Sequence, residues 1–309
     1  MVRYFSAIGM SDYVDQRKLD VFVRNVLQEQ SNPIYRYLEP GTDTVYVEVK
    51  KYMGDFAVAL RGKKEEDGKV NMSVILPTVQ ERTYSVLLDW EIEMDDPLIA
   101  FLIGEEEGTG AQLEISLLDL VECLMEKPAD AGDSLIAAFY ALSTEGKILL
   151  NVERSQEDEE AYRSEEEWRR QMLKRAREGD EEALEELKAD SLAMEEDILE
   201  RLEEEDIYSI LEGIFLPASE ELLGVYTIMG TILESEKVLN PYTEEWVYRL
   251  LLNVMGLNLT LFINPKDLVG EPLQGMRFLG TGLLQGAVSW GLTQFRQKAQ
   301  DMFSEDSNE

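Results

Sequence analysis

The sequence predicts an α+β protein whose β structure is mainly antiparallel. Three observations support this class: an amphipathic helical segment near the N-terminus, two groups of short segments rich in β-branched and aromatic residues, and a highly charged helical stretch between the groups. The chain has 309 residues, more than a single core usually supports. We therefore expect an N-terminal α+β domain with an antiparallel sheet over 1–152, an acidic helical linker over 153–206, a C-terminal β-rich domain over 207–295 and a polar tail over 296–309.

The N-terminal region begins with a predicted helix over residues 15–30. Leu19, Phe22 and Val26 recur at helical spacing with charged residues between them, so this face should be buried. The next segments are predicted strands of an antiparallel meander: 44–52, 56–61, 70–76 and 84–93. An apolar segment at 98–103, a helix at 113–125 and a hairpin of 135–142 and 147–152 complete the predicted domain.

The stretch over 153–206 contains 23 acidic and nine basic residues, and its apolar residues recur at three- and four-residue steps. Gly179 followed by Asp180 predicts the end of one helix and the capped start of the next. We expect these helices to expose solvated acidic faces. The alternative is a segment that docks a basic partner or mimics nucleic acid.

The C-terminal region predicts a mostly antiparallel sheet or a small barrel. Its predicted strands are 208–216, 225–233, 246–254 and 257–263. A tight turn at Asn264 and Pro265 leads to a glycine-rich strand over 270–286. That strand has neither the Gly-Lys-Ser/Thr ending of a phosphate-binding loop nor the dinucleotide-binding pattern, so its glycines indicate sharp bends or close backbone approach.

Arg277 is the one cation in this apolar, glycine-rich strand and is the main candidate site residue. It is predicted either to form a structural pair with Glu271 or Asp267, or to anchor an anionic ligand or a partner's carboxylate. Asp267, Glu271 and Arg277 are also the residues that a carboxylate-based enzyme would use, with or without a hard metal such as Mg²⁺. No motif for a resident cofactor or metal is present.

Composition excludes several classes of chemistry. The chain contains no histidine, so Ser-His-Asp and Cys-His nucleophile systems and histidine-ligated metal sites cannot be built. Cys123 is the single cysteine; it predicts a buried thiol, no internal disulfide and, with no signal peptide, a cytoplasmic protein. The apolar runs are too short to cross a membrane. The net charge of -34 argues against direct nucleic-acid binding and favours solubility.

Several motifs, spread over most of the chain, resemble those of one family. They are residues 4–10, 179–183, 206–210 with 215–217, 226–230, 262–265 with 267–268, 270–272, 277–278 and 285–286. In these motifs the chain resembles an uncharacterised family of cytoplasmic proteins of about this length from clostridial and related Gram-positive bacteria, catalogued as a domain of unknown function. The resemblance implies no activity, substrate or cofactor. This chain departs from the family pattern at Leu279, where the family has a lysine, and at Leu283, where it has a tryptophan, so a ligand contact through that lysine would be lost here.

The sequence as a whole predicts a non-catalytic intracellular binding or regulatory protein, with another protein as the expected partner. The alternatives are a carboxylate-based enzyme or small-anion-binding protein, and an acidic mimic of nucleic acid or docking protein for a basic partner. The oligomeric state is left open.

Overall fold

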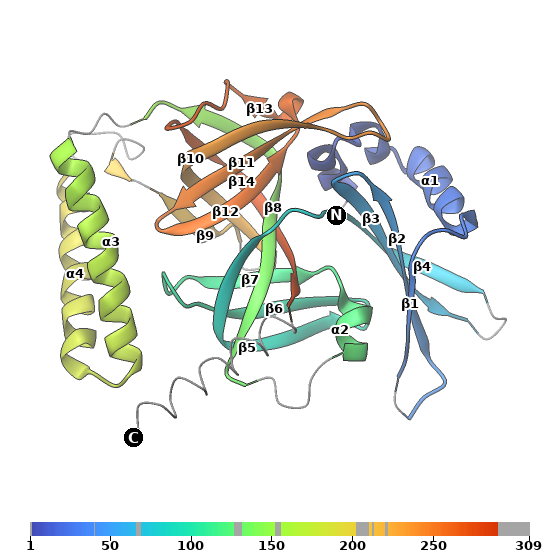
Figure 1. Cartoon of the computed structure of the whole chain (residues 1–309), viewed down its shortest axis with the longest axis horizontal. Helices are drawn as coiled ribbons and strands as arrows, with labels where there is room; N and C mark the ends of the chain where they lie inside the picture. Colours follow the sequence, from blue (N-terminus) through green and yellow to red (C-terminus); the bar gives the residue numbers. More distant parts are fainter. Residues whose placement is uncertain are drawn as a thin grey trace, which may run out of the picture.

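The structure is a computed structural model, and it describes residues 2–39, 41–65, 69–126, 132–151, 156–201, 210–211, 213–219 and 222–289. It confirms the α+β class: a four-stranded antiparallel sheet and a ten-stranded mixed sheet are accompanied by helices at both sides (Figure 1). The predicted polar tail over 296–309 lies outside the described residues.

The four-stranded sheet is formed by the first strands of the chain. Its strands, in spatial order, are β1 (Ile34–Leu38), β2 (Val45–Met53), β3 (Phe56–Lys64) and β4 (Val70–Val79). Helix α1 (Gln16–Gln28) confirms the predicted N-terminal helix, and Leu19, Phe22 and Val26 are its buried residues. The Asp15 carboxylate accepts hydrogen bonds from the backbone N–H groups of Arg17 and Lys18, which fixes where the helix begins.

The ten-stranded sheet collects strands from both halves of the chain. Its members are β5 (Thr83–Asp96), β6 (Ile99–Glu106), β7 (Gln112–Leu117), β8 (Ser134–Leu149), β9 (Ile214–Pro217), β10 (Val225–Leu239), β11 (Trp246–Val254), β12 (Leu257–Ile263), β13 (Leu268–Val269) and β14 (Arg277–Val288). The predicted domain boundary at residue 152 stays a prediction, but hydrogen bonds join strands on either side of it, because β8 pairs with β14 along most of its length.

The long β8 and β14 pair is the shared wall of two closed rings of strands. The first ring continues from β8 through β5, β6 and β7 back to β14. The second ring continues from β8 through β12, β11 and β10 back to β14. Close backbone approach at the glycines of β14 is confirmed, because a Cβ at Gly280 would lie 2.3 Å from the Glu145 carbonyl oxygen and one at Gly286 would lie 2.5 Å from that of Ala138.

Three local predictions are wrong. The segment over 84–93 does not extend the meander, because β5 leaves the first sheet and pairs with β6 and β8. The hairpin around Glu145 and Gly146 does not form, because β8 runs unbroken through both residues and its edge is hydrogen-bonded by β13 and β14. The segment over 113–125 is not one helix: β7 ends at Leu117, and the short helix α2 (Leu120–Glu126) follows. In each case a long-range pairing overrides a local signal.

A cluster of buried charges joins the four-stranded sheet to the ten-stranded sheet. Arg61 on β3 donates from Nε to Glu48 Oε2 at 2.6 Å, and its other nitrogens donate to the carbonyls of Leu98 and Leu117. Lys50 forms ion pairs with Glu48 and with Asp119. Because Arg61 and Glu48 are almost completely buried, Arg61 relies on Glu48 for its charge compensation, and Glu48 relies on Arg61 and Lys50. The Cys123 thiol, on α2, is buried as predicted.

The acidic stretch forms a helical hairpin, here called the helical arm, made of α3 (Gln156–Arg177) and α4 (Glu181–Arg201). It stands beside the ten-stranded sheet, on the side away from α1 and the four-stranded sheet (Figure 1). The predicted connection is confirmed: Gly179 has a φ of +91°, and Asp180 Oδ1 accepts from the backbone N–H groups of Glu182 and Ala183. Local sequence signals therefore set the arm's turn.

Candidate functional site

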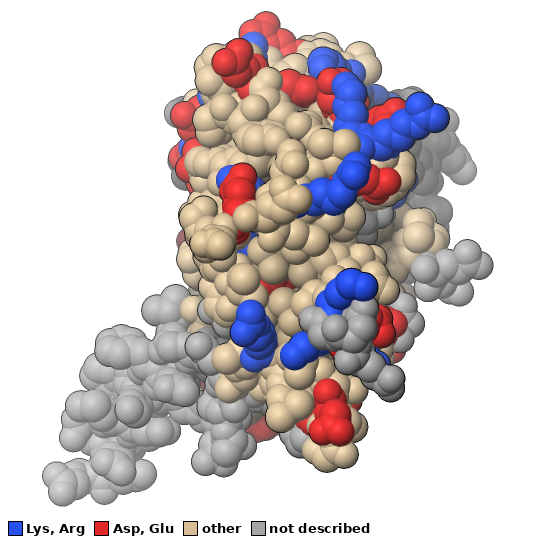
Figure 2. Space-filling model, turned by 90° about the vertical axis from the view of Figure 1, so that its right-hand side faces the viewer, with Lys and Arg blue, Asp and Glu red and all other residues tan. Residues whose placement is uncertain are grey.

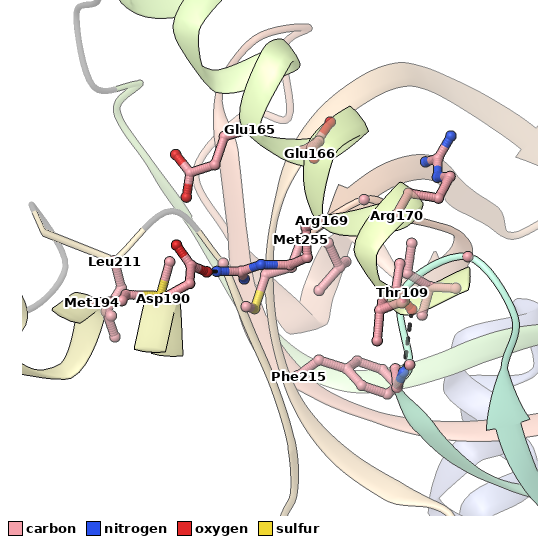
Figure 3. Close-up of a pocket in the computed structure, with 18 of the residues that line it drawn as sticks. Thr109, Glu165, Glu166, Arg169, Arg170, Asp190, Met194, Leu211, Phe215 and Met255 are labelled. Carbon is pink, nitrogen blue, oxygen red and sulfur yellow. Dashed lines mark hydrogen bonds and ion pairs between the residues drawn. The ribbon is translucent and has the colours of Figure 1, made fainter. Parts of the chain in front are cut away.

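A cleft of about 770 Å³ separates the helical arm from the ten-stranded sheet. Its walls come from α3, α4, the turn between β6 and β7, the turn between β11 and β12, and the chain just before β9 (Figure 3). The two turns belong to different rings, so the arm faces both rings across the cleft. This volume is within the range of small-molecule binding sites in proteins.

The far end of α3 is fixed to the first ring by one arginine. Arg177 donates from Nε to Glu105 Oε1 at 3.1 Å and from Nη1 to the Glu107 carbonyl oxygen at 2.5 Å. Leu173, one turn earlier, lies over Gly110 in the turn between β6 and β7. The arm is thus held to the sheet at the tip of its hairpin.

The same turn is stiffened by the buried carboxylate of Glu106. Its Oε2 accepts from both the backbone N–H and the hydroxyl of Thr109, each at 2.7 Å, and its Oε1 accepts from the Ser85 hydroxyl. Burial alone would raise the pKa of Glu106, but these hydrogen bonds outweigh it and hold the pKa below its ordinary value. The carboxylate therefore stays charged and orders the turn that forms one wall.

The base of the arm is held by Arg277, the residue that the sequence singled out. Its buried guanidinium donates to the carbonyl oxygens of Leu150, at 3.2 Å, and Leu211, at 3.1 Å. Leu150 precedes α3, and Leu211 follows α4 and lines the cleft. Arg277 therefore ties the chain entering the arm and the chain leaving it to β14.

The other two predicted site residues lie elsewhere. Asp267 accepts from the Ser6 hydroxyl at 2.5 Å, and Glu271 is exposed. Asn264 donates from Nδ2 to the Ser6 carbonyl oxygen. Asn264 and Asp267 therefore hold the N-terminal segment over 4–10 in place by hydrogen bonds to Ser6. Neither Asp267 nor Glu271 lines the cleft. Ligand binding by Arg277, Glu271 and Asp267 stays a prediction, and the contacts shown by Arg277 and Asp267 hold chain segments in place.

The floor of the cleft is apolar. Phe215 stacks on Tyr226 with ring centroids 4.4 Å apart and planes 13° from parallel, and Val254, Met255 and Leu257 contribute from the turn between β11 and β12. Tyr226 is itself fixed, because its hydroxyl accepts from the Glu114 backbone N–H at 2.9 Å. A stacked aromatic pair held in this way offers a rigid surface to a ligand.

Charged groups of the arm complete the cleft. Arg169 on α3 reaches Asp190 on α4 at 2.5 Å, whereas Arg170 points in another direction (Figure 3). Glu165 and Glu166 lie one turn before these arginines. Glu166 Oε1 is buried and has no hydrogen-bond partner among the described residues.

Sequence reasoning missed this site because it interpreted the acidic helices as solvated faces or as a docking surface for a basic partner, and not as the wall of a cleft. A signal existed in the spacing of Glu166, Arg169, Arg170 and Leu173, which places them on one face of a helix. The opposing turns are distant in sequence, so no local pattern shows what that face meets.

Two features are absent from the described part of the chain. No cluster of three or more acidic or cysteine side chains there could hold a metal ion. In the same residues, no helix is both long and apolar enough to span a membrane.

The fold and the cleft define an α+β protein in which a helical arm closes over a sheet of two rings. The chain belongs to the family described as "Domain of unknown function, E. rectale Gene description (DUF3881)", whose model matches residues 5–286. The predicted resemblance to an uncharacterised family is thereby confirmed at the level of the family. No curated protein and no solved structure matches the chain.

Proposed function

We propose that this chain is a non-catalytic cytoplasmic binding protein that takes a small organic ligand into the cleft between the helical arm and the ten-stranded sheet. The observation that carries the proposal is the cleft itself, which combines a ligand-sized volume, an apolar floor and a few charged groups at its wall. Such a site favours a ligand whose polar group contacts the charged side chains while its apolar part is buried against the floor.

The way the arm is attached supports a binding role. Arg177 holds the tip of the hairpin to the C-terminal end of β6, and Arg277 holds the base of the hairpin to β14. Between these points the arm faces the cleft, so a ligand there contacts the arm and both rings at once. Binding would therefore stiffen the arm, and this is how a ligand could regulate contacts with the expected protein partner.

The alternatives receive less support from the geometry. The carboxylate-based enzyme would use Asp267, Glu271 and Arg277, and none of the three lines the cleft. The acidic mimic would use the outer faces of α3 and α4. The acidic charge of these helices fits that role, but their geometry adds no support for it. Both remain hypotheses.

Filling the cleft tests the proposal. Ala193 on α4 is exposed, lines the cleft and can be changed to Trp without disturbing a buried core. Ala189, one turn earlier, is also exposed and does not line the cleft, so Ala189→Trp is the matched control. We expect the uncharged dye Nile red to bind the wild-type protein saturably, with a fluorescence increase that A193W abolishes and A189W retains.

Thermal unfolding should show that both variants remain folded. The proposal is wrong if the wild-type protein shows no saturable dye binding, or if A193W binds the dye as the wild-type protein does.

A further inference from the structure

The charge inside the cleft is negative once internal pairs are set aside. Asp190 neutralises Arg169, which leaves Glu165 and Glu166 against Arg170. Figure 3 shows Glu165 and Glu166 on the α3 side of the cleft, with the Arg170 guanidinium directed away from the pair of Arg169 and Asp190. The cleft therefore has an unbalanced carboxylate.

Glu166 is the carboxylate that most needs a positive partner. Its Oε1 is shielded from solvent beside the turn between β11 and β12, where a Cβ on Gly256 would lie 3.5 Å from it. No donor among the described residues reaches that oxygen. A carboxylate oxygen that has lost water without gaining a partner is costly, and a positive charge placed in the adjoining cleft reduces that cost.

The field of the whole protein favours the same sign of ligand. The net charge is -34, and residues 1–82 carry 12 acidic and 12 basic side chains, so the entire excess lies in residues 83–309, which include every residue that lines the cleft. Cations are concentrated and anions are repelled near such a surface.

The apolar floor decides which kind of cation fits. Phe215, Met255 and Leu173 offer no oxygen ligands with which to replace the water of a hard metal ion. They do offer contact area for a hydrocarbon chain or ring. The polar and apolar parts of the cleft thus match the two ends of one amphipathic molecule.

We infer that the ligand of this cleft is an organic cation, a protonated amine on an apolar body, with its ammonium group at Glu166 and its apolar part over Phe215. This inference rests on the proposed function and adds the chemical class of the ligand.

Three probes of one chain length and different charge test it: octylammonium, 1-octanol and octanoate, each titrated into the full-length protein by isothermal calorimetry at pH 7. We expect octylammonium to bind about tenfold or more tightly than octanol, as a charge-assisted contact would give, and octanoate to bind most weakly. Glu166→Gln should remove most of the advantage of octylammonium and leave octanol binding unchanged. Glu185→Gln, an exposed change on α4 outside the cleft, should alter neither.

Added salt should weaken octylammonium binding more than octanol binding. Equal affinities for the three probes, or an unchanged affinity for octylammonium in E166Q, would overturn the inference and leave the proposed function standing. Absence of octylammonium binding to the wild-type protein would also overturn it, and the Nile red titration then decides separately whether the cleft binds apolar ligands.

Discussion

The first 82 residues and the rest of the chain differ in net charge and in where charged side chains are buried. The first region is electrically balanced, and Figure 2 shows its Lys and Arg interspersed with Asp and Glu on the side that bears α1 and the four-stranded sheet. Yet this balanced region supplies the buried ionic cluster of Arg61, Glu48 and Lys50. The acidic region fills its two rings mainly with apolar side chains, such as Phe139 and Phe278.

The difference teaches that net charge does not indicate where charge is buried. A carboxylate that loses its water without gaining a partner is costly, whereas a charge with a matched partner and carbonyl acceptors can leave water at a smaller cost. Arg61 has both: the carboxylate of Glu48 and the carbonyls of Leu98 and Leu117. The contrast can be tested one region at a time.

The largest effect is expected from Arg61→Ala. Removing the arginine leaves Glu48 buried and charged with only Lys50 near it, so the free energy of unfolding should fall by about 3–5 kcal/mol. Urea denaturation measures this change. Arg36→Ala on exposed β1 is the control and should change stability by less than about 0.5 kcal/mol.

A double substitution, Glu48→Leu with Arg61→Met, sharpens the comparison. If the buried charges serve mainly to satisfy each other, the double variant should recover much of the stability lost in R61A. A loss in R61A of less than about 1 kcal/mol would contradict the dependence of Glu48 on Arg61.

An intermediate effect is expected from Glu106→Gln, in the acidic region. Glu106 is a buried carboxylate of that region, and we expect its loss to lower the free energy of unfolding by about 1–3 kcal/mol at pH 7. Its folded pKa lies below that of an unfolded glutamic acid, about 4.3, so its contribution is full above that pH and is lost as the pH falls through the folded value.

Urea denaturation at a series of pH values should therefore show the wild-type protein and E106Q converging in acid. Glu91→Gln, an exposed change on β5, should follow the wild-type curve. A difference between the wild-type protein and E106Q that is independent of pH would show that the charge of Glu106 contributes nothing.

The smallest effect is expected from salt. Repulsion among the acidic side chains of α3 and α4 is screened as ionic strength rises, so their amides should gain a few-fold protection from hydrogen exchange. Amides of β2 to β4 should change less, because that region is balanced. An equal increase in amide protection in α3 and α4 and in β2 to β4 would contradict the proposed electrostatic difference between the two regions.

The sequence by itself determined what depends on near neighbours. Leu19, Phe22 and Val26 fixed the buried face of α1, and Gly179 with Asp180 fixed the turn of the arm, because spacing and capping act within a few residues. The glycine spacing of β14 indicates close backbone approach, which Gly280 and Gly286 show, and the motifs along the chain indicate its family.

Only the tertiary structure decided the partners of each strand and the place of the cleft. From local sequence alone, β5 could have paired with β4, and the segment around Gly146 could have formed a turn. The long-range pairing of β8 with β5 and β14, which closes the two rings, determines the observed arrangement. The role of Arg277 shows the same limit, because the carbonyls that it binds are 127 and 66 residues away along the chain. Contacts of that separation depend on how the whole chain packs, and no local pattern encodes them.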